Sequence, residues 1–442
     1  MRFLVKLLCV LVVYCIAVPL GAEESVLTLT LDDAIERTLE YSITLQQNRI
    51  SLENKEYASD RLWAEIFPTI STGASISYGS TLFTGNAASQ SLEQNLSYST
   101  SVNLNLTLQA GIPYRMKLLD LAYRQQLLSY EDARRLLEIA AAQDFYALIA
   151  ERENLGQLAE TLSLAERQLE RQRIGRDNGL VSETTLLQSQ LGVQTARYDL
   201  SSAQATYSNN LGTFLSSLGL SPETPVNLVG EFDVRQLELD AEELIRDYLP
   251  KRPDIQQRRQ AIEESELNYR QSLLNARAPS VSFSFGWSGG SGNGGITVPF
   301  SDSVRGSISL SIPINSWIPG TTASQALRTA ESAIENARLS LKSTEDQAAG
   351  QIRSLAANLR NSWESLEIAR LRVEVAQRSY ELTERGFLNG VVESLTLETS
   401  RNNLAAARYQ LLRSEFSYQK LVLDLAQAIN ADWRQFISRS GS

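Results

Sequence analysis

The side chains available for catalysis are restricted, because the chain has no histidine and two cysteines, Cys9 and Cys15. Without histidine, Ser-His and Cys-His nucleophile systems, histidine general bases and histidine-ligated zinc sites are excluded. Carboxylate or serine-lysine chemistry remains, but the acidic residues are spread along helical stretches and no convergent pair stands out. We therefore expect no enzyme activity, no cofactor and no metal site.

The composition of the 442 residues also restricts the possible partners. Hydrophobic residues make up 43% of the chain, which is enough for a sizeable core. There are 41 Lys and Arg residues against 51 Asp and Glu, a net charge of -10, and no basic cluster could neutralise a run of phosphates. Nucleic acid is not expected as a partner.

The first 22 residues have the pattern of a secretory signal peptide. Arg2 and Lys6 precede an apolar run over 7–20, and Gly21-Ala22 supplies the small residues of a cleavage site. The alternative is a membrane anchor, but the run is shorter than the ~20 residues of a spanning helix. We predict cleavage after Ala22, which removes both cysteines and leaves an exported chain without thiols.

The rest of the chain is an internal repeat with an offset of 211 residues. Phe67-Pro68 corresponds to Ala278-Pro279, and Asn178-Gly179-Leu180-Val181 corresponds to Asn389-Gly390-Val391-Val392. The same offset pairs Leu186 with Leu397, Ala196-Arg197-Tyr198 with Ala407-Arg408-Tyr409, and Tyr207 with Tyr418. Ile112-Pro113 and Ile318-Pro319 look equivalent but lie 206 residues apart. Either the second repeat has lost and regained five residues, or these prolines are not equivalent.

Each repeat changes from a helical to a strand period in the same order. Helical spacing extends from about Leu31 to Phe67, interrupted near Ser42, and from Leu237 to Ala278, where Arg252-Pro253 breaks the helix. Alternating apolar and polar residues then predict two β-hairpins, at about 69–110 and 280–313.

The two faces of the predicted strands differ in polarity. One carries mainly serine, threonine and asparagine, and the other carries large apolar side chains. This alternation is typical of a transmembrane barrel with lipid outside and water inside, although soluble sandwich strands also alternate. Aromatic residues near the predicted strand ends would form a girdle at the membrane interface: Tyr78, Phe83, Tyr98, Trp287, Phe300 and Trp317.

Two unusually long helices follow the hairpins. No proline interrupts Tyr114 to about Arg176 or Thr321 to Arg385, so each helix would extend about 90 Å at ~1.5 Å per residue. Asn178-Gly179 and Asn389-Gly390 supply the turns, and the returning helices have the seven-residue apolar period of a coiled coil. The sequence therefore predicts two long helical hairpins.

Four strands leave two unpaired edges, and unpaired backbone groups cannot face hydrocarbon. The sheet must therefore close with strands from other copies of the chain. Two copies would give about eight strands and a filled interior, whereas three would give twelve strands around a lumen. The small polar side chains of the inner face favour the wet lumen and a trimer, whose helical hairpins would form a second tube.

In this order of elements the chain resembles the TolC family of outer-membrane efflux proteins over nearly all of its mature length. The residues that carry the resemblance are Phe67-Pro68-Thr69-Ile70-Ser71, Ala278-Pro279-Ser280-Val281-Ser282 and the two Asn-Gly tips. The resemblance implies a mainly α fold with transmembrane β: a homotrimeric channel-tunnel, with four strands per protomer in a twelve-stranded barrel and a periplasmic coiled-coil tube closed at its tip.

The resemblance also implies a function. The channel would sit in outer-membrane lipid and give passive exit to substrates of a tripartite efflux pump or type I secretion system. Its partners would be a periplasmic adaptor (membrane fusion) protein and an inner-membrane pump of the RND, ABC or MFS type. The alternative is a cell-surface or periplasmic structural coiled-coil protein without channel activity, for which two lumen-suited polar strand faces serve no purpose.

The resemblance places candidate sites at the helical tips, near 175–183 and 386–394. Gly179, Leu180, Gly390 and Val391 match the family's adaptor-docking turns, although turn geometry alone also explains the glycines. Charged residues within about two helical turns, which three-fold symmetry would repeat as rings, are candidates for the periplasmic gate: Arg173, Arg176, Asp177, Glu183, Arg385 and Glu393. The alternative is solvated ion pairs worth ~0–1 kcal/mol.

These observations define the expected organisation of the chain. We expect a signal peptide at 1–22, a first repeat at 23–218 and a second repeat at 237–430. The linker at 219–236 would contribute to the equatorial belt that the family has around its tube. Residues 431–442 would form a short polar tail.

Overall fold

The computed structural model describes residues 27–80, 94–230, 232, 234–291 and 300–437. It contains two compact units, and each combines segments of both sequence repeats. Of the described residues, those within 1–46, 133–244 and 351–442 form unit 1, and those within 47–132 and 245–350 form unit 2. Two long helices, α4 (Ile112–Asp177) and α8 (Thr322–Leu388), contribute residues to both units.

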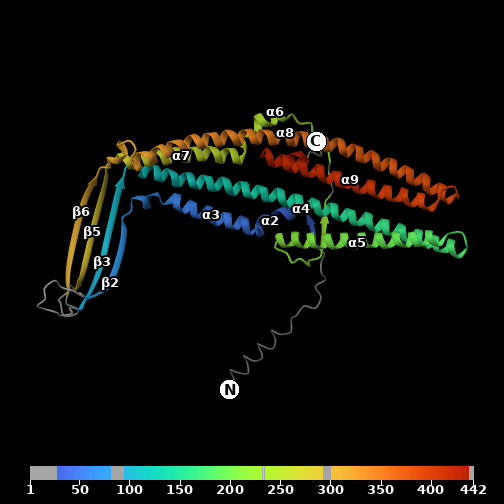
Figure 1. Ribbon diagram of the computed structural model, residues 1–442, viewed down its shortest axis with the longest axis horizontal. Helices are drawn as coiled ribbons and strands as arrows, with labels where there is room; N and C mark the ends of the chain where they lie inside the picture. Colours follow the sequence, from blue (N-terminus) through green and yellow to red (C-terminus); the bar gives the residue numbers. More distant parts are fainter. Residues whose placement is uncertain (1–26, 81–93, 231, 233, 292–299, 438–442) are drawn as a thin grey trace, which may run out of the picture. The chain divides into compact units, whose positions relative to one another are not determined.

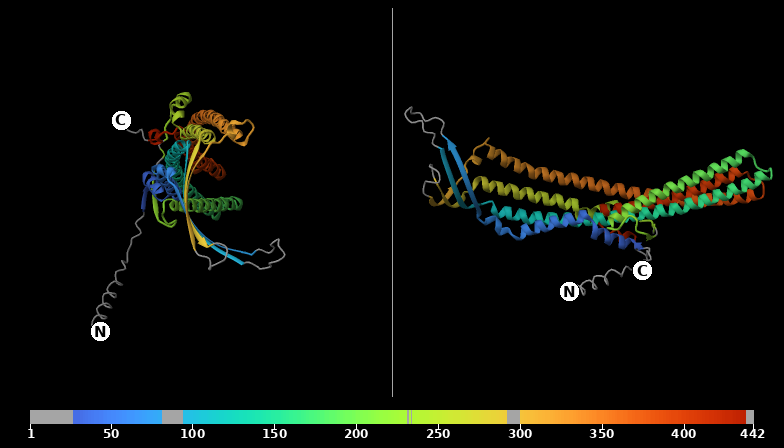
Figure 2. Two further views of the ribbon diagram at one scale, coloured as in Figure 1. Left: turned by 90° about the vertical axis from the view of Figure 1, so that its left-hand side faces the viewer. Right: turned by 90° about the horizontal axis from the view of Figure 1, so that it is seen from below.

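Unit 2 contains one antiparallel sheet of four strands (Figure 1, Figure 2). The strands are β2 (Thr69–Ser80), β3 (Gln94–Gln109), β5 (Ser280–Ser291) and β6 (Ser301–Ser311), in the order β2-β3-β5-β6. The two predicted hairpins are present, and they join through pairing of β3 with β5. Strands β2 and β6 are therefore the two edges of the sheet.

The helical part of unit 2 is linked by polar contacts between long side chains. Helix α7 (Pro253–Arg277) begins at the proline of the predicted break, after η2 (Leu249–Lys251). Its Glu263 accepts a hydrogen bond from Arg124 of α4 at 3.0 Å, and its Glu266 accepts one from Arg338 of α8 at 3.3 Å. Helix α7 therefore contacts both long helices. The remaining elements are α3 (Ile43–Asp60), η1 (Leu62–Ile66) and η4 (Asn315–Trp317).

Unit 1 contains the helices that return after the two tips, α5 (Glu183–Ser217) and α9 (Ser394–Ala428). It also contains a parallel pair of short strands, β1 (Leu27–Thr30) and β4 (Val226–Val229), with α2 (Leu31–Tyr41) and the first half of α6 (Ala241–Tyr248), whose second half belongs to unit 2. Strand β4 lies within the segment that the sequence analysis expected to be a linker. Four-residue strands are too short to show an alternating pattern, so the sequence did not reveal this pair.

The core of unit 1 forms around the short strand pair and the middle of α4. One buried cluster consists of Leu29, Ala34, Phe145, Leu148, Ile149, Phe214, Leu215, Leu218 and Leu228. A second consists of Ile35, Ile139, Ala141, Ala142, Tyr146, Leu423, Ala426 and Trp433. These clusters join segments from both ends of the chain, which explains why the units do not follow the repeats.

The C-terminal segment differs from the expected polar tail. Asn430 has a φ of +53°, and the N–H of Ala431 donates to the carbonyl of Ala426 at 3.0 Å, so the chain turns sharply after α9. This turn places Trp433 in the core, where it is only 5% exposed. Helix α10 (Arg434–Ile437) follows. The prediction of a polar tail is wrong for this segment because it overlooked Trp433, which anchors the segment in the core.

The structure settles the register of the two repeats. Helices α4 and α8 begin at Ile112 and Thr322, 210 residues apart, close to the offset of 211 elsewhere. Pro113 lies in the first turn of α4, whereas Pro319 precedes α8 and the turn at Gly320, whose φ is +83°. The strand registers explain the offset of 206 between these prolines: Thr69 pairs with Asn105 and Ser280 with Ser311, so β2 and β5 are offset by 211 residues but β3 and β6 by 206. The second repeat has therefore lost five residues within its hairpin and regained them before its tip, where the offset is again 211.

Among the helices of the described ranges, none combines the length and the hydropathy needed to traverse a bilayer.

Candidate functional site: the serine-lined sheet and the helical tips

The strand register places the apolar residues of all four strands on one face of the sheet. Val102, Trp287 and Val304, for example, lie side by side across β3, β5 and β6. These side chains are not covered: Ile76 is 78% exposed and Ile308 is 74% exposed. A sandwich would bury this face, so the soluble-sandwich interpretation is wrong. An apolar surface of this extent requires a lipid or protein cover.

The opposite face of the sheet is lined by hydroxyl groups that bind one another across the strands. Hydrogen bonds join Ser75 to Ser99 at 2.8 Å, Ser77 to Ser97 at 2.8 Å, Ser284 to Ser307 at 2.6 Å, Ser288 to Ser303 at 3.0 Å and Thr107 to Ser282 at 3.2 Å. The hydroxyl groups of these small side chains satisfy one another's hydrogen-bonding capacity, and the surface that they form is polar. This face is suited to water, as the sequence pattern predicts.

Aromatic residues gather at the end of the sheet where the described parts of β3 and β6 begin. Tyr98 stacks on Phe300 with ring centroids 6.4 Å apart, and Tyr78 is 62% exposed near the end of β2. Trp287 instead lies inside β5, opposite Val304 on the apolar face. Phe83 lies outside the described residues.

A second aromatic group occupies the opposite end of the sheet, and the sequence analysis identified only Trp317 there. Trp317 follows β6, is 61% exposed and lies beneath the Arg277 guanidinium at 4.8 Å. Trp63 and Phe67, which precede β2, form an edge-to-face pair with centroids 5.5 Å apart. They were missed because they fall in the predicted helical stretch before the strand. Exposed aromatic side chains therefore lie at both ends of the sheet.

The first helical tip is a Schellman turn built on a left-handed glycine. Gly179 has a φ of +73° and donates its N–H to the carbonyl of Arg176 at 2.8 Å. Leu180 donates to the carbonyl of Gly175 at 2.8 Å. The same pair of hydrogen bonds recurs 211 residues later around Gly390, whose φ is +74°. Both turns satisfy the final carbonyl groups of a long helix before the chain reverses.

A second glycine supports each tip, and sequence reasoning missed it. A Cβ on Gly175 would lie 2.6 Å from Val181 Cγ2, and a Cβ on Gly386 would lie 2.6 Å from Val392 Cγ2. Each glycine thus leaves room for the valine that follows the turn. The 211-residue offset between Gly175 and Gly386 was the available signal.

The apolar docking candidates at the tips are almost completely solvent-accessible. Leu180 and Val391 are each 82% exposed, the highest values among the large hydrophobic side chains that the structure describes. Each lies at the reversal of its helical hairpin, next to the left-handed glycine. Each repeat therefore exposes one large apolar side chain at the equivalent position of its tip.

The charged gate candidates are only partly brought together within one copy of the chain. Arg176 contacts Glu183 across the first tip with 3.2 Å between Nη2 and Oε2, and both side chains are largely exposed. Arg173 lies 4.0 Å from Glu170 on the same helix. Asp177, Arg385 and Glu393 form no ion pair with another residue of the described ranges. Such exposed pairs contribute little to stability.

A group of polar residues lies farther from the tip glycines than the sequence analysis considered. Tyr380 of α8 donates a hydrogen bond to Glu384 at 3.0 Å, and burial, this hydrogen bond and the charge of Glu384 raise the pKa of its hydroxyl. Burial lowers the pKa of the Arg401 guanidinium on α9, although the neighbouring Glu398 opposes that shift. Arg408 of α9 contacts Glu160 of α4 at 3.1 Å. Arg408 therefore connects α9 to α4 behind the tips, whereas the hydrogen bond from Tyr380 to Glu384 lies within α8.

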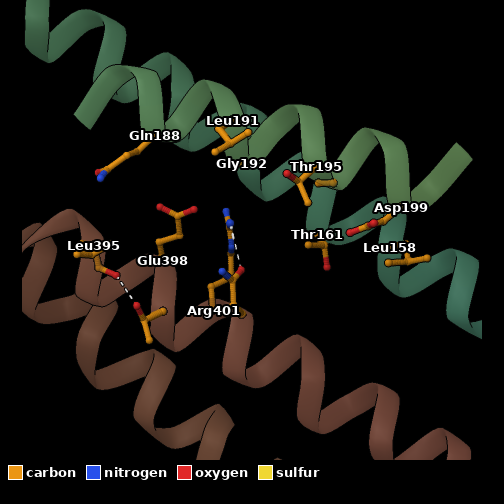
Figure 3. A pocket seen from close by; sticks show the side chains of 13 residues that line it. Leu158, Thr161, Gln188, Leu191, Gly192, Thr195, Asp199, Leu395, Glu398 and Arg401 are labelled. Carbon is orange, nitrogen blue, oxygen red and sulfur yellow. Dashed lines mark hydrogen bonds between the residues drawn. The ribbon is translucent and has the colours of Figure 1, made fainter. Parts of the chain in front are cut away.

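Arg401 and Glu398 line a cavity of about 490 Å³ between α5 and α9 (Figure 3). Gly192 of α5 permits the close approach of Glu398, whose Oε1 would lie 3.1 Å from a Cβ at that position. The cavity is lined by both polar and apolar side chains. No group of three or more potential metal-ligating side chains is present in the described ranges.

Comparisons with known proteins agree with this geometry. Residues 244–431 match the sequence model of the outer membrane efflux protein family. The chain is 24% identical over 406 residues to the probable efflux pump outer membrane protein TtgC of Pseudomonas putida, covering 84% of this chain and 76% of that protein. The antibiotic efflux pump outer membrane protein ArpC of Pseudomonas putida matches with the same identity and coverage.

Solved structures share the fold over nearly the whole chain. The CmeC outer membrane channel of Campylobacter jejuni superposes with a TM-score of 0.72 and 16% identity, over 92% of this chain and 88% of that one. CusC gives a TM-score of 0.72 at 16% identity, over 94% and 96% of the two chains. The open-state MtrE channel of Neisseria gonorrhoeae gives 0.65 at 16% identity, over 91% and 89%. The repeat, the sheet and the tips agree with these similarities: the chain has the fold of outer-membrane efflux channels and matches the outer membrane efflux protein family over residues 244–431.

Proposed function

We propose that three copies of this chain close their sheets into a twelve-stranded barrel in the outer membrane, which gives substrates of a tripartite efflux pump a passive exit. The observation that carries the proposal is the sheet itself. It has two unpaired edges, one exposed apolar face and one hydroxyl-lined face. Closure with other copies satisfies the edges, covers the apolar face with lipid and turns the hydroxyl face toward water.

The sizes of the side chains that would face the barrel interior favour three copies of the chain over two. The hydroxyl-lined face carries mainly serine, threonine, asparagine and glycine. An eight-stranded barrel needs larger inward side chains to fill its interior, whereas twelve strands leave an open lumen that small polar side chains can line.

The relatives indicate the class of system and of solute. Two of them are described as outer membrane proteins of an antibiotic efflux pump and a toluene efflux pump. We infer that this chain exports small organic molecules and receives them from an inner-membrane pump through a periplasmic adaptor. The exposed apolar side chains of Leu180 and Val391 would contact the adaptor.

The first test is the mass of the purified mature protein in detergent together with its conductance in a planar bilayer. A trimer that inserts and conducts supports the proposal. A monomer or dimer that never inserts refutes it and favours a structural coiled-coil protein. Cleavage of the chain is checked in the same preparation, because N-terminal sequencing should begin at Glu23.

The docking surface is tested separately in cells that lack the native gene. The double variant Leu180→Asp, Val391→Asp should fail to restore efflux of a fluorescent drug, while the purified variant conducts like the wild type. Leu180→Met with Val391→Ile keeps the tips apolar and should restore efflux. Full efflux by the aspartate variant would exclude docking through these side chains.

A further inference from the structure

Strand β6 carries the only two charged residues of the four-stranded sheet, Asp302 and Arg305. The register places them on opposite faces. Asp302 lies opposite Gly289 on the apolar face and accepts a hydrogen bond from the indole N–H of Trp287 at 3.4 Å. Arg305 lies opposite Gly286 on the hydroxyl-lined face and is exposed. One cation therefore stands alone on a surface that is otherwise uncharged.

The surroundings of Arg305 leave its guanidinium free. Gly286 has no side chain to cover it, and the neighbouring hydroxyls of Ser303 and Ser307 are bound to Ser288 and Ser284 on β5. Within the described ranges, the Arg305 side chain has no hydrogen bond and no ion pair, and only its backbone pairs with β5. Its charge is therefore available to solutes that pass over this face.

Closure of the sheet would not neutralise Arg305. Strand β6 is one edge, and the strand that meets it in a closed barrel is β2 of the next copy. The hydroxyl-lined face of β2 carries Ser71, Gly73, Ser75 and Ser77. None of these has a carboxylate, so no register of the contact can pair Arg305 with an acidic residue of β2.

We propose that Arg305 sets the ion preference of the barrel, as a ring of three guanidinium groups that attracts anionic solutes and disfavours cations. The inference rests on the proposed trimeric channel and adds the charge class of the solutes that its lumen favours. Anions could interact with the guanidinium groups through charge-assisted hydrogen bonds.

The expected size of the effect follows from Coulomb's law with screening. At ~0.1 M salt the Debye length is ~10 Å, and a charge about 10 Å from an ion in water changes the local ion concentration by roughly 1.3-fold. Three such charges give about a twofold change. Since anions are enriched as cations are depleted, the permeability ratio of cations to anions changes by about fourfold.

The test is the reversal potential of single channels in a potassium chloride gradient centred near ~0.1 M. Arg305→Gln should raise the permeability ratio of K⁺ to Cl⁻ about fourfold, and Arg305→Glu should raise it further. Arg305→Lys keeps the charge and should match the wild type. Asp302→Asn, on the same strand but the opposite face, is the matched control and should leave the ratio unchanged.

The salt dependence provides an independent readout. At ~1 M salt the Debye length falls to ~3 Å, and the difference between Arg305→Gln and the wild type should disappear. If Arg305→Gln conducts with an unchanged ratio at low salt, the inference is overturned and the channel proposal stands. If the wild type forms no pore, the proposed function is refuted, and the inference that rests on it is refuted with it.

Discussion

Replacing Gly179 by alanine should loosen the first helical tip. Gly179 has a φ of +73°, and a Cβ at this position would meet no atom within 4 Å. The substitution therefore introduces no clash, and its effect comes only from holding an L-residue in the left-handed conformation. The turn that depends on this conformation contains the hydrogen bonds from Gly179 to Arg176 and from Leu180 to Gly175.

The magnitude follows from the cost of the left-handed conformation, which is ~1–2 kcal/mol for most L-residues. A cost of this size multiplies the fraction of open tips by roughly 5 to 30. Hydrogen exchange measured by mass spectrometry on a peptide covering residues 174–186 should speed up by the same factor, because the amides of Gly179 and Leu180 exchange only when the turn opens. Exchange in α4 far from the tip should not change.

Two variants separate backbone strain from a general effect of mutation. Gly179→Asn should speed exchange less than Gly179→Ala, because asparagine tolerates the left-handed region. Gly156→Ala lies in the interior of α4, where a Cβ also meets no atom within 4 Å, and it should stabilise the helix by ~1 kcal/mol. Equal exchange rates in Gly179→Ala and the wild type would refute the reasoning.

Two further predictions concern stability. Tyr418→Phe removes a buried hydroxyl that donates to the backbone carbonyl of Arg235 at 2.6 Å. It should cost about 1–2 kcal/mol and lower the Tm by about 1–2 °C for a chain of this length, whereas the exposed control Tyr409→Phe should leave the Tm unchanged. Burial raises the pKa of Asp254, but hydrogen bonds and charge from Arg252 outweigh it and lower that pKa below its usual value. Its contribution to stability is therefore complete above the ordinary carboxyl pKa of ~3.9 and is lost as the pH falls through the lowered value. Asp254→Asn should lower the Tm at pH ~7, and the Tm values of the variant and the wild type should converge in strong acid. Thermal unfolding measured across this pH range tests the prediction. A constant difference in Tm at all pH values would contradict the lowered pKa of Asp254.

The sequence by itself determined the parts of this protein that depend on local signals. A period of two along β2, β3, β5 and β6 fixes which side chains share a face, since successive residues of a strand point to opposite sides. The long proline-free stretches predict α4 and α8, and the Asn-Gly pairs locate both turns because glycine readily adopts a positive φ. The 211-residue offset likewise requires no knowledge of the fold.

Only the tertiary structure decided the features that depend on contacts between distant segments. The pairing of β1 with β4 and the burial of Trp433 have no periodic signal, because a four-residue strand and a single side chain are too short to show one. The isolation of Arg305 opposite Gly286 became visible only when the register of β5 and β6 was known. Periodicity predicts the face of a helix or strand on which a residue lies. The neighbours of that residue depend on packing and hydrogen bonding between elements that are far apart in the sequence.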